Sequence, residues 1–361
     1  MNGSIRMLNR TMLLACGPFI GLMAWLLLSQ FTVTLSGDAW PAAPAAEGSG
    51  AGAAESPAAK LEKGLEQAQQ TAAHTGRSIQ KQLKLYKQTN EEMANISAAA
   101  SSLAKRPLAI YDRRITRKLG TPSATIESDK LRAQLFYIKA QNFRAYALKV
   151  RLKSDDAMKM ALGRDELGGA ETTLSAVKRY KAAAGVNAGG FADGGGKRYP
   201  LGTTVLNGQY VDGFQPSYKD LFFVGLNGNN KLIGGKFYSK QQLDALKPKF
   251  GASFVPMLLK NGARLPIPEK WQNNPRRAPR TVIANYKDDQ LLFLVVDGYS
   301  EDGSSGATLD EVQTLLQRYG AVDGYNLDGG GSSTLVFNGR VVNHPSDGQL
   351  RKVATNFLFF K

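Results

Sequence analysis

We expect the fold of this chain to be organised around the stretch YNLDGGGSST, residues Tyr325–Thr334. Tyr325 and Leu327 fit the buried face of a short strand, and Asn326 and Asp328 then point to the other face, because successive strand side chains alternate. The glycines that follow have no Cβ, so the backbone can turn sharply and approach a ligand closely. Further polar groups come from Gly329, Gly330, Gly331, Ser332, Ser333 and Thr334. We expect a strand end that lines a site for an oxygen-rich substrate; the competing interpretation is a tight turn without a ligand.

The bulk composition restricts the class of protein and of partner. The chain has 361 residues, 43% of them hydrophobic, and a formal net charge of +16. This length and this apolar fraction suit one large packed domain with accessory segments. The positive charge favours an anionic partner such as nucleic acid, anionic lipid, a wall polymer or a phosphorylated sugar. The alternative is that the charge serves only solubility and a basic cytoplasmic tail. The sequence has no RNP-type aromatic motif, zinc finger or basic recognition helix, so we expect no nucleic acid.

Cysteine and histidine are scarce. Cys16 is the single cysteine, so no intramolecular disulfide can form. His74 and His344 are the only histidines, which argues against a histidine-rich metal site and against a Ser-His-Asp triad. We expect no cofactor, and no EF-hand-like spacing indicates a calcium loop.

Residues 1–35 have the pattern of a membrane anchor. Arg6 and Arg10 precede an apolar run from Met12 to Leu28 that extends towards Leu35. A bilayer needs about 20 such residues, and the flanking positive charge predicts a cytoplasmic N-terminus. The rest of the chain would then be extracellular, and a cleaved signal peptide with a secreted product is the alternative.

Two accessory segments follow. Residues 36–58, rich in Ala, Gly, Pro and Ser, predict a flexible linker. Residues 59–105 predict a helical or coiled-coil stalk, which Pro107 would end before a connecting segment to Asp129. The apolar repeat comprises Leu61, Leu65, Ala68, Ala72, Ile79, Leu83, Tyr86, Met93 and Ala100. It fits either a dimerisation stalk, and hence a homodimer, or a single helix packed on the domain.

From Lys130 the sequence changes to short strands and turns. Alternation predicts a half-buried strand over Arg144–Leu152, and continuous apolar runs predict buried strands over residues 221–226 and 291–296. Asn-Gly pairs predict type I′ hairpins at residues 207–208, 261–262 and 338–339. Helices are expected at residues 172–183 and 308–319, and a closing strand at 353–360. Residues 106–361 therefore predict an α+β domain with a mixed, largely antiparallel sheet and few helices.

Three residues could carry chemistry near strand ends. Asp297 follows the apolar run 291–296 and precedes a glycine, Arg280 precedes another apolar stretch, and Asp328 precedes the triple glycine. Taken singly, Asp297 could cap a turn and Arg280 could be a surface residue. The pattern predicts that Glu311 is a solvent-exposed residue of the helix and that Asp310 helps to cap it. His344 reads as an exposed loop residue with weak acid/base potential. The glycine-rich turns lack the spacing of a phosphate loop or of a dinucleotide fingerprint.

Several motifs occur in a recognisable order. The sequence contains PRT at 279–281, VDG at 296–298, ATLDE at 307–311 and GAVDGYNLDGGGSST at 320–334. GVNAGGF at 185–191 precedes them, and an N-x-P-S-D…R pattern runs from Asn343 to Arg351. Over about residues 130–361 the chain resembles the phosphodiester glycosidase family. Two departures concern Tyr299, where that family often has arginine, and Ala188, where glycine is more usual.

The resemblance implies a hydrolase that cleaves a sugar-1-phosphodiester, here in envelope or exopolysaccharide material. It implies catalytic roles for Asp328, Asp297 and Arg280, with either acid as nucleophile or base. The substrate-binding residues would be Asn187, Gly189, Gly190, Asn326, Gly329, Gly330, Gly331, Ser332, Ser333 and Thr334. A metal requirement, the sugar, its aglycone and the stereochemical outcome stay open. The alternative is a non-catalytic carbohydrate- or wall-binding module that assists polysaccharide assembly.

Overall fold

A computed structural model describes residues 56–300 and 304–361 of the chain. The expected membrane anchor and nearly all of the expected linker lie outside these residues. Among the described residues, no helix is both long and apolar enough to cross a bilayer. The chain divides into two compact units, one that ends at Asn90 and one that runs from Glu91 to Lys361.

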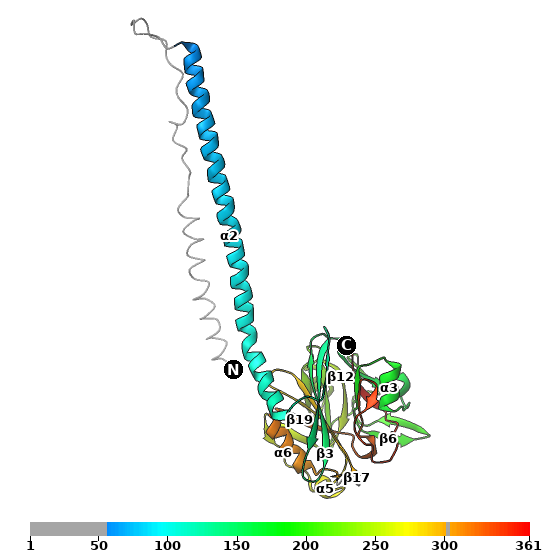
Figure 1. Ribbon diagram of the computed structural model, residues 1–361. Coiled ribbons are helices and arrows are strands. Elements are labelled where there is room, and N and C mark those ends of the chain that lie inside the picture. Colours follow the sequence, from blue (N-terminus) through cyan, green and yellow to red (C-terminus); the bar gives the residue numbers. More distant parts are fainter. Residues whose placement is uncertain (1–55, 301–303) are drawn as a thin grey trace. The chain divides into compact units, whose positions relative to one another are not determined.

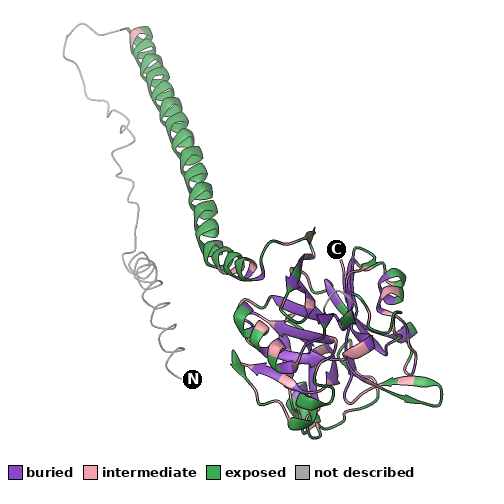
Figure 2. Ribbon diagram, turned by 60° about the horizontal axis from the view of Figure 1, so that its bottom comes forward, coloured by how far each residue is buried: buried purple, intermediate pink, exposed green. Residues whose placement is uncertain are grey.

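Helix α2 (Pro57–Leu119) is 63 residues long, and most of its length is exposed to solvent (Figures 1 and 2). The helix predicted over residues 59–105 is therefore confirmed. Its predicted end at Pro107 is wrong, because Pro107 lies inside the helix. The exposed side chains include large apolar ones: Leu61, Leu65, Ile79, Leu83, Leu85, Tyr86, Met93, Ile96 and Leu103.

Packing explains why α2 continues past Pro107. Proline inside a helix removes one hydrogen bond at a cost of about 3 kcal/mol. Beyond it, Ile115 and Leu119 are buried in the larger unit. The buried Lys149 donates hydrogen bonds to Asp112 Oδ1 and Thr116 Oγ1, both at 2.7 Å. These contacts offset the lost bond and hold the last turns in place.

Three sheets build the larger unit. The eight-stranded sheet has the order β1 (Ala124–Glu127), β2 (Leu131–Lys139), β3 (Arg144–Leu152), β16 (Leu291–Val296), β15 (Arg280–Asn285), β19 (Gly324–Leu327), β13 (Met257–Lys260) and β14 (Ala263–Arg264). A five-stranded sheet has the order β11 (Leu232–Gly235), β10 (Phe222–Asn227), β12 (Pro248–Phe254), β8 (Val205–Leu206) and β9 (Gln209–Tyr210). The other has the order β21 (Arg340–Val341), β20 (Leu335–Phe337), β5 (Ala184–Asn187), β22 (Thr355–Phe359) and β4 (Met158–Leu162).

The remaining elements are short. Two ribbons pair β6 (Phe191–Gly194) with β7 (Lys197–Pro200) and β17 (Tyr299–Ser300) with β18 (Ser304–Ser305). The helices are α3 (Thr173–Arg179), α4 (Lys240–Asp244), α5 (Glu269–Asn273), α6 (Leu309–Tyr319) and the 3₁₀ turns η2 (Gly163–Asp165) and η3 (Gly330–Ser332). Every strand pair in these sheets and ribbons is antiparallel, which confirms the predicted α+β class.

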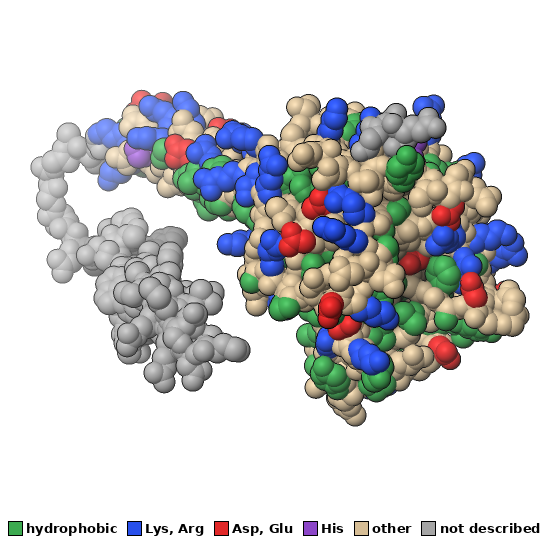
Figure 3. Space-filling model, turned by 90° about the horizontal axis from the view of Figure 1, so that it is seen from below, with side chains coloured by type: hydrophobic (Ala, Val, Ile, Leu, Met, Phe, Trp, Pro, Cys, Tyr) green, Lys and Arg blue, Asp and Glu red, His purple; other side chains and the backbone are tan. Residues whose placement is uncertain are grey.

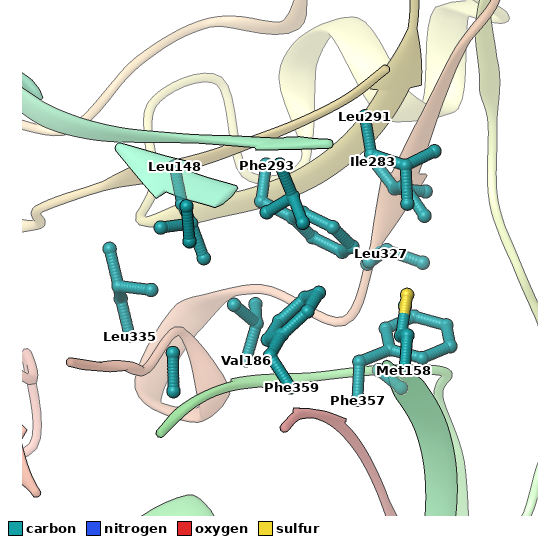
Figure 4. Close-up of a cluster of buried hydrophobic side chains, with 14 of the residues drawn as sticks. Leu148, Met158, Val186, Ile283, Leu291, Phe293, Leu327, Leu335, Phe357 and Phe359 are labelled. Atoms are coloured by element: carbon teal, nitrogen blue, oxygen red, sulfur yellow. The ribbon is translucent and has the colours of Figure 1, made fainter. Parts of the chain in front are cut away.

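The eight-stranded sheet is buried on both faces. One face packs against the two five-stranded sheets, and Figure 4 shows Leu148, Ile283 and Phe293 pointing toward Val186 and Phe357 across this core. The other face packs against α6 and the end of α2. A sheet covered on both faces has apolar strands throughout, which is why residues 291–296 form a continuous apolar run.

Local sequence signals account for the turns and caps. The three predicted Asn-Gly hairpins are present, each with positive φ at both turn residues, as a type I′ turn requires. Helix α6 begins with a capping box in which Thr308 and Glu311 bind each other's backbone amides. The prediction that Glu311 is only a solvated helix residue is therefore wrong. Helix α3 is shorter than predicted, because Lys181 adopts a positive φ soon after its last turn.

Candidate active site

The predicted acids follow two strands that flank a third. Strand β15 lies between β16 and β19, and Arg280 pairs with Val296 while Thr281 pairs with Leu327. Because β16 and β19 are both antiparallel to β15, they run in the same direction and end at the same edge. Asp297 and Asp328 come directly after them. Two strand spacings separate their backbones, which is about 10 Å.

Asp328 occupies an unusual electrostatic environment. Its main chain is fixed, since its amide donates to Ala188 O at 3.1 Å and its carbonyl accepts from Asn187 Nδ2 at 2.6 Å. Its carboxylate atom Oδ2 is buried and has no hydrogen-bond partner in the described residues. Burial raises the pKa of Asp328 to about 6, although the positive charges of Arg351 and Arg198 act in the opposite direction. A carboxyl group that titrates near neutral pH suits acid/base chemistry.

The three glycines after Asp328 suit this turn for different reasons. A Cβ at position 329 would lie 2.8 Å from Pro279 O, and one at 331 would lie 1.9 Å from Asp347 Oδ2. Gly330 has a φ of +59°, which favours glycine, and its amide donates to Pro279 O at 3.0 Å. The turn is therefore held between Pro279 and Asp347, and the sequence alone did not indicate these partners.

Asn187 positions this turn from the neighbouring sheet. It is fully buried, and its Oδ1 accepts from Thr281 Oγ1 at 2.9 Å and from the Thr334 amide at 3.0 Å. Thr281 Oγ1 also lies 3.1 Å from Ser333 Oγ. Since Nδ2 binds the Asp328 carbonyl, both polar atoms of the Asn187 side chain bind protein groups in this structure. A direct contact of Asn187 with substrate stays a prediction.

The other predicted substrate-binding residues surround the same turn. Asn326 donates through Nδ2 to Val255 O at 2.7 Å, whereas its Oδ1 and Ser332 Oγ are buried without a hydrogen-bond partner in the described residues. Thr334 Oγ1 donates to Ser332 O at 3.1 Å. Gly189 and Gly190 lie against β12, where an added Cβ would come within 2.5 Å of Ala252 or Phe254. Their roles towards substrate stay predictions.

Asp297 differs from Asp328 in having partners for both oxygens. Its Oδ1 accepts from the His344 amide at 2.8 Å, and its Oδ2 lies 3.3 Å from His344 Nδ1. The Tyr146 hydroxyl lies 3.3 Å from the same ring nitrogen, and its pKa is raised by burial and by the charge of Asp297. Asp297 itself is buried, whereas the His344 side chain is 74% exposed. The histidine thus connects Asp297 to solvent, a role that its loop position in the sequence did not indicate.

Arg280 begins β15, the strand between the two strands that precede the acids, yet its side chain donates to backbone carbonyls and not to either acid. It is buried, and it donates through Nε to Ala307 O at 3.1 Å and through Nη2 to Pro275 O at 3.0 Å. Burial lowers its pKa to about 10. In the described part of the chain, no carboxylate forms an ion pair with it, and the positive charges that act on Asp328 come from Arg198 and Arg351.

Arg198 and Arg351 border a groove of about 920 Å³. Arg198 comes from the ribbon β6–β7, and Arg351 comes from the loop between β21 and β22. The sequence motifs did not indicate either arginine as a site residue, although Arg351 ends one of them. Within the described residues, no three His, Cys, Asp or Glu side chains are placed to hold a metal ion.

Comparison with known proteins supports the resemblance found in the motifs. The model of the family described as phosphodiester glycosidase matches residues 180–360, half of the chain. The catalytic domain of zebrafish N-acetylglucosamine-1-phosphodiester alpha-N-acetylglucosaminidase, auto-inhibited by its pro-peptide, has a similar structure. It aligns with a TM-score of 0.53 at 22% identity, over 67% of this chain and 87% of that chain. This likeness shows the fold.

Two relatives match parts of this chain in sequence. The SPbeta prophage-derived uncharacterized protein YomE of Bacillus subtilis is 30% identical over 194 residues, which are 51% of this chain and 28% of that protein. The bovine N-acetylglucosamine-1-phosphodiester alpha-N-acetylglucosaminidase is 41% identical over 68 residues, 19% of this chain and 12% of that enzyme. The chain therefore matches less than a third of the length of these relatives.

Proposed function

The chain belongs to the phosphodiester glycosidase family, and we propose that it hydrolyses a sugar-1-phosphodiester between the anomeric carbon and the phosphate oxygen. The observation that carries this proposal is the environment of Asp328. Its Oδ2 is buried without a hydrogen-bond partner in the described residues, and its pKa is raised to about 6. Asp297 follows a strand that ends at the same edge of the sheet, so two acids are available to one substrate.

The leaving group determines what the protein must supply. When the bond to the anomeric carbon breaks, a phosphate monoester leaves with the bonding electrons, and water supplies the new hydroxyl group of the sugar. Such a leaving group is already stable as an anion, so a strong general acid is less needed than for an ordinary glycoside. We assign to Asp328 the proton that water loses, because a carboxylate with this pKa is ionised at neutral pH and still accepts protons readily. Asp297 then faces the positive charge that develops on the sugar.

Arg280 and the amides of Gly329 and Gly331 are proposed to stabilise the phosphate, since the Gly330 amide already donates to Pro279 O. A buried guanidinium without a carboxylate partner is costly unless an anion compensates it. Arg280 meets this description within the described residues, where its bonds go to the carbonyls of Ala307 and Pro275. A phosphate at this edge of the sheet would provide the missing negative charge.

Release of sugar from a synthetic sugar-1-phosphodiester tests the function. The wild-type protein should release free sugar, and Asp328→Asn should not. Asp212→Asn is a matched control, since it makes the same change at an exposed aspartate. If Asp328→Asn releases sugar as fast as the wild type, Asp328 is not part of the active site. Binding of the diester without turnover by the wild type would favour a carbohydrate-binding module.

We further propose an envelope or exopolysaccharide setting, with the N-terminal segment as anchor and α2 as a homodimeric stalk. The support for the stalk is a row of apolar residues spaced by seven on an exposed helix, comprising Leu65, Ala72, Ile79, Tyr86, Met93 and Ala100. Analytical ultracentrifugation of the wild type should give a dimer, and Ile79→Ser with Met93→Ser should give a monomer. A monomeric wild type would exclude the stalk. Fractionation of cells with an N-terminally intact chain tests the anchor.

A further inference from the structure

The groove beside Asp328 has a composition that hydrolysis of a single diester does not explain. Its lining includes five basic and three acidic side chains, a net charge of +2. The basic residues are Arg164, Lys197, Arg198, Arg351 and Lys352, and the acidic ones are Glu166, Asp193 and Asp347. Figure 3 shows basic side chains gathered at the right-hand edge of the molecule, the side on which Figure 1 draws β6. A groove with this net charge attracts anions.

Two of the basic residues are paired with acidic partners. Arg198 binds both oxygens of Asp193, at 2.7 and 2.9 Å, donates to Lys352 O and stacks on the Phe191 ring at 4.0 Å. Arg351 donates to Asp347 Oδ2 through Nε at 3.0 Å and through Nη2 at 2.6 Å. Their charges are therefore compensated in part by those acids.

Three other basic residues have no such compensation. Arg164, Lys197 and Lys352 are exposed, and in the described part of the chain no carboxylate forms an ion pair with any of them. They come from three separate elements: the turn η2, the start of β7 and the segment before β22. Like charges brought together from distant segments repel each other unless an anion lies among them.

The groove adjoins the proposed reaction site through the Asp347–Arg351 pair, which lines the groove and contacts Gly331. Gly331 lies against the Asp347–Arg351 pair, since an added Cβ would be 1.9 Å from Asp347 Oδ2 and 2.4 Å from Arg351 Nη2. Arg198 and Arg351, which border the groove, are also the positive charges that act on Asp328. A substrate with its reacting carbon at Asp328 can therefore extend into the groove.

We propose that the groove binds a second anionic group of the substrate, so that the preferred substrate is a saccharide chain with further phosphates beside the diester that is cleaved. The proposal rests on the function proposed above. Lys197 and Lys352 determine this preference through charge, and neither takes part in the chemical step. The volume of about 920 Å³ accommodates more than one sugar phosphate unit.

Two synthetic substrates separate the preference for a second anionic group from the hydrolysis itself. One carries only the reactive sugar-1-phosphodiester, and the other carries a second phosphodiester on its aglycone. The wild type should have a higher kcat/KM for the second substrate, roughly three- to twentyfold, because each exposed charge contact contributes a few-fold. The preference should fall when salt is raised from 0.05 to about 0.5 M, as expected for exposed charges.

The Lys197→Gln, Lys352→Gln double variant should lose this preference and keep the wild-type kcat/KM for the singly charged substrate. A control with the same charge change is Lys139→Gln, Lys236→Gln, since both lysines are exposed and lie outside the groove. The control should keep the preference. Equal kcat/KM of the wild type for the two substrates, or a preference that the groove variant retains, overturns the proposal.

A binding measurement makes the proposal independent of turnover. In the Asp328→Asn background, calorimetry should show tighter binding of the doubly charged compound, and the two groove substitutions should remove that difference. If neither compound is hydrolysed by the wild type, the proposed function fails, while this difference in affinity still decides whether the groove binds a second anion. Equal affinities overturn the proposal.

Discussion

Asp297 and Asp328 are the same residue type at equivalent positions after two strands that run in the same direction, yet their surroundings differ. Asp297 has hydrogen-bond partners for both oxygens in His344. Asp328 has a buried Oδ2 without one in the described residues and a pKa raised to about 6. The comparison shows that the loop packed over a strand end, rather than the strand itself, sets the chemistry of the acid. It also suggests different tasks, with proton transfer at Asp328 and charge stabilisation at Asp297.

The largest expected effect is on turnover. We predict that Asp328→Asn lowers kcat for a sugar-1-phosphodiester by about 10²–10⁴-fold, the usual contribution of a positioned acid or base. Asp297→Asn should also lower kcat, because the charge that faces the sugar is lost. The two variants differ in rescue: an external base such as azide or formate should restore part of the activity of Asp328→Ala only. Rescue of Asp297→Ala instead would reverse the two assignments.

The free energy of unfolding should change in opposite directions when Asp328 and Asp297 are substituted. The folded pKa of Asp328, about 6, is above its ordinary value of 3.8, so the native state binds this proton more tightly than the unfolded state. The stability that protonated Asp328 contributes is complete below about pH 3.8 and is lost as the pH rises through about 6. Asparagine cannot ionise, so Asp328→Asn should be more stable than the wild type above pH 6, by at most about 3 kcal/mol.

Urea unfolding at pH 4 and at pH 8 checks this prediction. The gain for Asp328→Asn should appear at pH 8 and vanish near pH 4. Asp297→Ala provides the contrast, because it leaves the His344 amide without its acceptor and should destabilise by about 1–3 kcal/mol. An Asp328→Asn protein that is less stable than the wild type at pH 8 contradicts the assigned environment.

The sequence predicted most strands of this site but not its charges. The continuous apolar run 291–296 located β16, because a sheet buried on both faces has apolar strands, and alternation located β3 and β19. Strand β15 was not predicted as a strand, since only an apolar stretch after Arg280 marked it. The cations around Asp328 depend on long-range packing. Arg198 reaches the site on a ribbon that follows β5, and Arg351 on a loop before β22, and no local pattern encodes either approach. The predicted helix end at Pro107 is wrong for the same reason, because tertiary contacts near Ile115 outweigh the local helix-breaking effect of the proline.

The arginine beside Asp328 should tune the pH dependence. If Asp328 is the base, kcat/KM rises as the pH increases through about 6, and a positive charge nearby keeps that midpoint low. Arg351→Gln should therefore move the midpoint upward, by up to about one pH unit because Arg351 is partly exposed and screened. Arg351→Gln with Asp347→Asn removes the ion pair without a change in net charge, and its midpoint should move less. A downward shift in the single variant contradicts the electrostatic assignment.

The smallest effect tests whether the phosphate lies nearer to Asp328 than to Asp297. Tyr299 follows Asp297 and Gly298 and is 84% exposed, so Tyr299→Arg should change the free energy of unfolding by less than about 0.5 kcal/mol. The added charge lies on the Asp297 side. If the phosphate is held by the turn after Asp328, KM for a sugar-1-phosphodiester should fall by only about twofold, with Tyr299→Gln as the neutral control. A decrease in KM of tenfold or more would place the phosphate beside Asp297 and remove the distinction between the two acids.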